Sequence, residues 1–172
     1  MMKNRLFSVA ALYILALTIT VSSCSNSKPV AAKSAVAAPA NRVSAKVAPG
    51  LEEQILELIN RHRKTKGLPA LQYNYVIATV AREHTMNMAT KRVAFGHGGF
   101  SARSKYIRSK ISGVMVVAEN VAFGSMTAEE VVKGWLNSPP HKKNIEGNFR
   151  LTGIGVARDV KSTLYFTQIF AN

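Results

Sequence analysis

The chain has 172 residues and a formal net charge of +14, from 23 lysines and arginines against 9 aspartates and glutamates. This length fits one folded domain with appendages, and the positive charge favours anionic partners such as phospholipid headgroups, anionic polymers or nucleic acid. The single cysteine, Cys24, excludes an intrachain disulfide and any zinc site built from several cysteines.

The first segment has the features of an export signal. Lys3 and Arg5 precede an apolar run over residues 6–21 that only Ser and Thr interrupt. A charged start followed by a run of this length is typical of a secretory signal peptide, whereas a membrane-spanning helix, the alternative, needs roughly 20 residues. We therefore predict a signal peptide over residues 1–23, whose removal lowers the net charge to +12.

The sequence Val21-Ser22-Ser23-Cys24 resembles a lipobox, in which small residues precede the cysteine that becomes lipidated. We expect Cys24 to anchor an exported lipoprotein to a membrane of the bacterial cell envelope, facing the periplasm or the cell surface. Export argues against nucleic acid as a partner. Residues 24–50 lack acidic side chains and any helical or strand period, which indicates a solvated tether.

Two helices are predicted at the start of a domain over residues 51–172. Apolar residues at one-face spacing predict a helix over residues 51–66, which Gly67 ends, and His62 is expected to contact its terminal carbonyls. Asn74 is a suitable N-cap for a second helix that reaches about Arg92. His84 lies on its apolar face and is expected in the core.

The middle of the domain contains a loop, a weak helix and a strand. Three glycines within residues 96–99 indicate a flexible loop that holds His97. Residues 100–111 are basic and weakly helical, and residues 114–123 indicate a strand. A capping box over residues 127–130 then begins another helix.

The end of the domain predicts an antiparallel hairpin. Prolines at 139 and 140 end the preceding helix and can begin a short one, before strands over residues 151–159 and 162–170. The last strand is apolar on both faces, which requires cover on both sides. The fold class is therefore α+β, a three-layer α-β-α sandwich with a small antiparallel sheet between helices.

Glu119 is the most informative polar residue, because its neighbours over residues 115–123 are apolar on both faces of the predicted strand. A buried carboxylate needs a cation, a histidine, hydrogen-bond donors or a metal. It could be structural or functional. His97 and His141 are the other candidates, but each is separated from the next by a spacing that is not typical of a metal motif.

Four segments recur together in one known family: Phe95-Gly96-His97, Ala118-Glu119-Asn120-Val121-Ala122, Trp135-Leu136-Asn137-Ser138-Pro139-Pro140-His141 and Tyr165-Phe166-Thr167-Gln168. They resemble bacterial CAP domains, the family of cysteine-rich secretory proteins, antigen five and plant pathogenesis-related proteins. The resemblance extends in order over residues 51–172 and implies the same α-β-α sandwich.

The resemblance also implies a cleft lined by histidines and glutamates, which binds a divalent metal in some members of the family. The cleft residues it suggests here are His97, Glu119, His141, Tyr165 and Gln168. His97, Glu119 and His141 could hold Zn²⁺ with water in an open position. The family's four-residue metal cluster is incomplete, since two of its places hold Ser138 and Tyr165.

Three functions remain open at this point. The first is a non-enzymatic envelope lipoprotein whose cleft binds a ligand, and the second is a metal-assisted hydrolase of peptide or cell-wall polymer. The third is a module that binds lipid or another anionic surface. The sequence offers no evident nucleophile or oxyanion device, and family membership does not by itself assign an activity.

Overall fold

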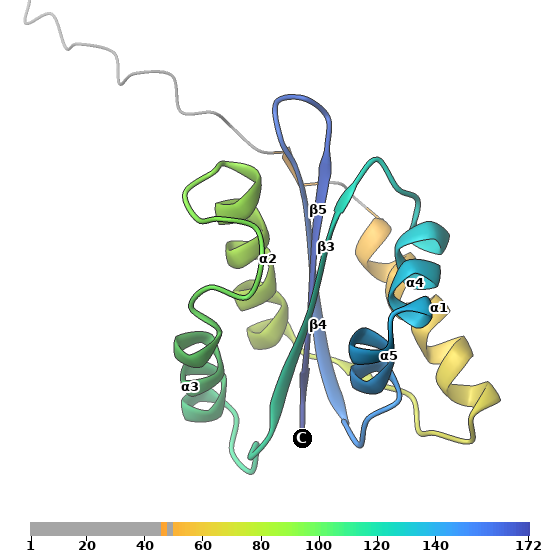
Figure 1. Ribbon diagram of the computed structural model, residues 1–172. Helices are drawn as coiled ribbons and strands as arrows, with labels where there is room; N and C mark the ends of the chain where they lie inside the picture. Colours follow the sequence, from red (N-terminus) through yellow and green to blue (C-terminus); the bar gives the residue numbers. More distant parts are fainter. Residues whose placement is uncertain (1–45, 48–49) are drawn as a thin grey trace, which may run out of the picture. The chain divides into compact units, whose positions relative to one another are not determined.

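A computed structural model describes residues 46, 47 and 50–172, with side chains from residue 50 onward (Figure 1). The predicted signal peptide, Cys24 and most of the predicted tether lie outside these residues. Residues 39–172 form one compact unit that holds every described helix and strand, so we treat this unit as the folding domain. Its described helices include none that is both long enough and apolar enough to cross a membrane.

The centre of the domain is an antiparallel sheet of three long strands: β3 (Val117–Gly124), β4 (Leu151–Arg158) and β5 (Leu164–Ala171). β5 lies between β4 and β3, and β4 and β5 form the predicted hairpin. Two short strands add to the outer edge of β4. β1 (Lys46–Val47) pairs antiparallel and lies within the predicted tether, whereas β2 (Gln72–Tyr73) pairs parallel and was not predicted.

One face of the sheet is covered by α2 (Tyr75–Ala89) and α3 (Phe100–Lys110) (Figure 1). Helix α2 lies directly on β4 because two glycines leave room for its backbone. A Cβ atom on Gly153 would lie 2.1 Å from the Ala78 nitrogen, and one on Gly155 would lie 2.4 Å from the Arg82 nitrogen. These positions require glycine for close helix–sheet packing.

The other face is covered by α1 (Leu51–Thr65), α4 (Ala128–Asn137) and α5 (Pro139–Ile145). The predicted capping box is present at the start of α4, where the side chains of Thr127 and Glu130 each accept a hydrogen bond from the other's backbone nitrogen. Trp135 is buried in the core on this side. Helices thus cover both faces of the sheet, which confirms the three-layer fold.

The structure confirms the order of the predicted elements and corrects some details. α2 ends at Ala89 rather than near Arg92, because Lys91 adopts a left-handed conformation with φ of 59°. β3 begins later than predicted, because the nitrogens of Met115 and Val116 both donate to the terminal Asn172 carbonyl. The prediction that His62 contacts the terminal carbonyls of its own helix was wrong.

The His62 ring packs toward α5 instead of capping its own helix. Its Nε2 lies 2.9 Å from Oε1 of Glu146. This hydrogen bond lowers the pKa of Glu146 below its ordinary value.

Candidate functional site

Alternation along β3 places Glu119 on the side of the sheet that faces α2 and α3. Val117 and Val121, two positions before and after it, pack in the buried clusters on that side. Ala118 and Ala122 pack against the core on the opposite side. Because successive strand side chains point to opposite faces, Glu119 points toward α2, α3 and the loop between them.

Glu119 is buried, as predicted, and cationic or polar donors surround its carboxylate. Arg103 of α3 approaches it side-on, with Nε 2.9 Å from Oε2 and Nη2 2.8 Å from Oε1. His97 Nδ1 lies 2.9 Å from Oε1, and it carries a proton because an ionised carboxylate can only accept. The guanidinium of Arg103 therefore donates a hydrogen bond to each of the two carboxylate oxygens.

Arg103 also fixes the loop that carries His97. Its Nη1 donates to the Gly98 carbonyl at 2.7 Å, and Gly99, with φ of 77°, turns the chain into α3. The His97 side chain is 53% exposed, so its second nitrogen can face solvent while its first contacts Glu119. One arginine thus joins α3, the loop and β3.

His84 forms the third side of the cluster. Its Nε2 donates to the Gly96 carbonyl at 2.9 Å and lies 4.0 Å from Oε1 of Glu119. Burial lowers the pKa of His84, and the positive charges of Arg103 and His97 also lower it, against the opposing effects of the Gly96 carbonyl and Glu119. The ring is therefore neutral at pH 7. The structure confirms its predicted place in the core and adds its contact with the site.

His141 lies on α5, where its Nδ1 is 2.9 Å from the hydroxyl oxygen of Ser138. Burial, and then the charge of His97, lower the pKa of His141, so a neutral ring accepts this hydroxyl proton. α5 is bonded to β3 through Asn144, whose side chain donates to the Glu119 carbonyl at 3.3 Å. Within residues 50–172, His141 makes no hydrogen bond to the Glu119 carboxylate.

Tyr165 and Gln168 lie apart from the Glu119 carboxylate. Tyr165 faces the same side of the sheet and pairs in register with Phe123, near the end of β3. Lys91 donates to its hydroxyl, and its ring stacks on that of Phe123. Gln168 lies beside Asn120 in register, on the opposite face, and donates to Thr152 Oγ1 at 3.1 Å. The structure therefore brings together His97 and Glu119 but neither of these two residues.

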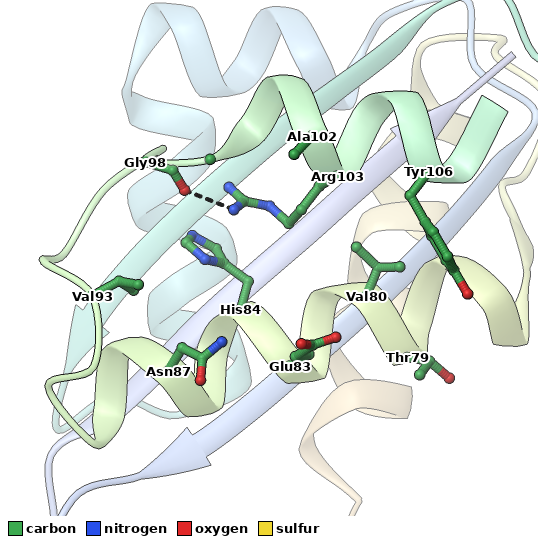
Figure 2. Close-up of a pocket in the computed structure, with 11 residues that line it drawn as sticks. Thr79, Val80, Glu83, His84, Asn87, Val93, Gly98, Ala102, Arg103 and Tyr106 are labelled. Carbon is green, nitrogen blue, oxygen red and sulfur yellow. Dashed lines mark hydrogen bonds between the residues drawn. The ribbon is translucent and has the colours of Figure 1, made fainter. Parts of the chain in front are cut away.

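A cavity of about 490 Å³ opens between α2 and α3, against the cluster. His84 and Arg103 form part of its wall, so the residues that hold Glu119 also face this space. Figure 2 shows side chains from both helices pointing toward it, and the Arg103–Gly98 hydrogen bond crossing its end. The lining residues are Thr79, Val80, Glu83, His84, Asn87, Val93, Gly98, Gly99, Ala102, Arg103 and Tyr106.

The arrangement does not fit a metal centre. A metal at Glu119 would compete with Arg103 for both carboxylate oxygens and would lie beside a permanent positive charge. His84 Nε2 carries a proton for the Gly96 carbonyl. Among the residues that the structure describes, no three His, Cys, Asp or Glu side chains are placed to hold a metal ion. The zinc site at His97, Glu119 and His141 stays a prediction.

Sequence reasoning missed Arg103 and the role of His84. The available signal for Arg103 was indirect: a buried Glu119 needs a cation, and the basic segment over residues 100–111 supplies several. The turn geometry that selects Arg103 among them is not readable from spacing. His84 was placed correctly, but its distance from Glu119 depends on how α2 packs on β4 and β5, beside β3.

The model of the CAP family, the cysteine-rich secretory protein family, matches residues 56–170. In Bacillus subtilis strain 168, the chain is 36% identical over 122 residues to uncharacterized protein YkwD, covering 69% of this chain and 46% of that protein. It is 32% identical over 123 residues to uncharacterized membrane protein YlbC, covering 69% of this chain and 34% of that protein. The chain thus spans less than half the length of these curated relatives.

Solved structures show the same fold. An extracellular protein of Bacillus anthracis with an SCP domain has a TM-score of 0.61 and 29% identity, covering 75% of this chain and 45% of that one. An outer surface protein of Borrelia burgdorferi has a TM-score of 0.64 at 21% identity, covering 76% of this chain and 98% of that one. The match of the family model over most of the folded domain, together with this fold, shows that the chain belongs to the CAP family.

Proposed function

We propose that this protein is an exported lipoprotein whose CAP domain binds a small, mostly apolar ligand between α2 and α3 without catalysing a reaction. The observation that carries the proposal is the cavity of about 490 Å³ whose wall includes His84 and Arg103. This volume lies within the range of roughly 300–1,000 Å³ that small-molecule pockets occupy.

The cavity lining indicates the chemistry of the ligand. Val80, Val93 and Ala102 supply apolar surface, while Glu83 and Asn87 supply oxygen acceptors from α2. Arg103 is already committed to Glu119 and Gly98 and is not free to hold a ligand anion. An apolar molecule with one donor or positively charged group matches this lining best.

The same contacts argue against the hydrolase alternative. A general base needs a free lone pair within reach of the substrate proton. Both oxygens of Glu119 accept from Arg103, and Oε1 accepts from His97 as well. Three of its four lone pairs are therefore occupied and its side chain is only 1% exposed, so the carboxylate is poorly placed to take a proton from a substrate.

Export and anchoring rest on the sequence features of residues 1–24. Two structural neighbours support an exported location by name, one as an extracellular protein and one as an outer surface protein. Cys24 is the only lipidation candidate, since the chain has a single cysteine.

Lipidation predicts a direct result in bacteria fed with labelled palmitate. The full chain should incorporate the label, and Cys24→Ser should incorporate none, because the thiol that accepts the diacylglycerol is lost. Ser23→Ala is the matched control and should keep the label, since a small residue remains before the cysteine. Equal labelling of the wild type and Cys24→Ser would contradict the anchor.

Filling the cavity should abolish ligand binding. The neutral fluorescent probe N-phenyl-1-naphthylamine is titrated into residues 39–172. Ala102→Trp places an indole in the cavity and should weaken binding at least about tenfold, a loss typical of a blocked apolar pocket. Ser101→Trp, one residue away and not part of the lining, should bind like the wild type. Unchanged binding by a folded Ala102→Trp variant would show that the cavity is not the site.

The Arg103–Glu119 pair should be required for stability. Arg103→Met leaves a buried carboxylate without its cation and should lower the free energy of unfolding by about 3–5 kcal/mol. Arg108→Met, at an exposed position of the same helix, should change it by less than about 0.5 kcal/mol. The double variant Arg103→Met/Glu119→Gln should recover part of the loss. Urea unfolding of residues 39–172 measures these differences, and equal midpoints for the two arginine variants would contradict the pair's role.

Zinc titration by calorimetry tests the metal prediction made from the sequence. With Arg103 on both carboxylate oxygens, we expect residues 39–172 to give no more heat than the double variant His97→Ala/His141→Ala. Saturable one-to-one binding by the wild type that this double variant lacks would show that Zn²⁺ displaces the guanidinium. That result would restore His97, Glu119 and His141 as a metal site.

A further inference from the structure

Acidic side chains are unevenly distributed along the strand direction of the domain. Acidic side chains gather at the end of the sheet where β3 finishes: Glu52 and Glu53 in the first turn of α1, Glu129 and Glu130 in the first turn of α4, and Asp159 after β4. β5 ends at the opposite end of the sheet, and the last turn of α3, with Arg108 and Lys110, lies at that end too (Figure 1). No Asp or Glu occurs in the sequence between Glu83 and Glu119.

We propose that this second end docks on an anionic lipid surface. We call it the basic end and define it by Arg108, Lys110, Met115, Val116 and Arg150. The backbone brings these residues together from three segments. Met115 and Val116 hydrogen-bond to Asn172, and the nitrogen of Arg150 donates to the Ala171 carbonyl beside it. Ile107 of α3 packs in one cluster with Val114 and Ala171, which places Arg108 and Lys110 at the same end.

Exposed apolar side chains distinguish the basic end from a purely ionic patch. Met115 is 76% exposed and Val116 is 56% exposed, and the two residues stand just before the edge strand β3. Tyr75, at the start of α2, is 79% exposed and lies at this end of the sheet because the Asn74 nitrogen donates to the Thr152 carbonyl. Neighbouring exposed apolar groups commonly mark a contact surface, and Met115 and Val116 are neighbours in the chain.

The combination of cations with protruding apolar groups fits a membrane interface. Lysine and arginine are attracted to anionic headgroups, while methionine, valine and tyrosine side chains can enter the boundary beneath them. A soluble polyanion would use the cations and leave Met115 and Val116 in water. The proposal depends neither on lipidation of Cys24 nor on a ligand in the cavity, since it uses residues outside both.

The test is cosedimentation of unlipidated residues 39–172 with vesicles of phosphatidylcholine, with and without phosphatidylglycerol. The wild type should bind only the vesicles that contain phosphatidylglycerol, and more weakly as salt rises. Arg108→Glu/Lys110→Glu should weaken binding at least tenfold. The matched control Arg92→Glu/Lys161→Glu carries the same charge change at the opposite end, where α2 ends and β4 turns into β5, and should bind within about threefold of wild type.

A second variant separates lipid from other anionic partners without altering charge. Met115→Ser/Val116→Ser should weaken vesicle binding at least about threefold while binding to heparin stays unchanged. Circular dichroism confirms that each variant is folded. If this variant binds vesicles like the wild type, or if both charge-reversal variants lose binding equally, the basic end is not a lipid-docking surface.

Discussion

The candidate site depends on the burial of one carboxylate at an edge strand. Glu119 cannot remain ionised in an apolar layer unless donors replace the water it loses. Arg103 supplies two of them and His97 a third, and the same guanidinium holds the Gly98 carbonyl. The reach of one arginine side chain therefore sets the distance between α3 and β3 and the path of the loop. The cavity is the space that remains between α2 and α3 once Arg103 is fixed at its end.

Buried charge joins the helices to the sheet elsewhere as well. Glu52 of α1 accepts from Arg82 of α2, whose single Nε–H lies 3.0 Å from both carboxylate oxygens and whose Nη2 also donates to Oε2. Glu52 also accepts from the Val156 nitrogen on β4 at 3.2 Å, so this pair joins helices from opposite faces around the sheet edge. Arg63 is fully buried and donates to the Pro69 carbonyl before β2, to the Ile145 carbonyl at the end of α5 and to the Gly147 carbonyl after it. Each of these charges has at least one partner far away in sequence. Removing one partner of such a buried pair is costly, because it leaves the other charge buried and uncompensated.

This pattern explains what the sequence could predict. Local signals identified the elements: the Asn74 cap, the capping box before α4 and the two-sided apolar β5 are all present. The burial of Glu119 also followed from its apolar neighbours. Its partner did not, because several basic residues in the preceding segment satisfy the same requirement, and only the packing of α3 selects Arg103. Tyr165 and Gln168 came from the resemblance alone. Strand alternation places Gln168 on the opposite face of the sheet, and the register places Tyr165 beside Phe123, four residues along β3 from Glu119.

The chemistry open to the cluster follows from which lone pairs remain free. Glu119 accepts from Arg103 and His97, and His84 uses its Nε2 proton on the Gly96 carbonyl. His141 Nδ1 accepts from Ser138. The outward nitrogen of His97 is therefore the nitrogen of this cluster with the clearest access to solvent, because the ring that carries it is half exposed. A half-exposed imidazole without a nucleophile or an oxyanion device beside it lacks the parts that acyl transfer or hydrolysis requires. The part of the wall formed by His84 and Arg103 is suited to binding, because both side chains are held by hydrogen bonds and present a fixed surface to a ligand.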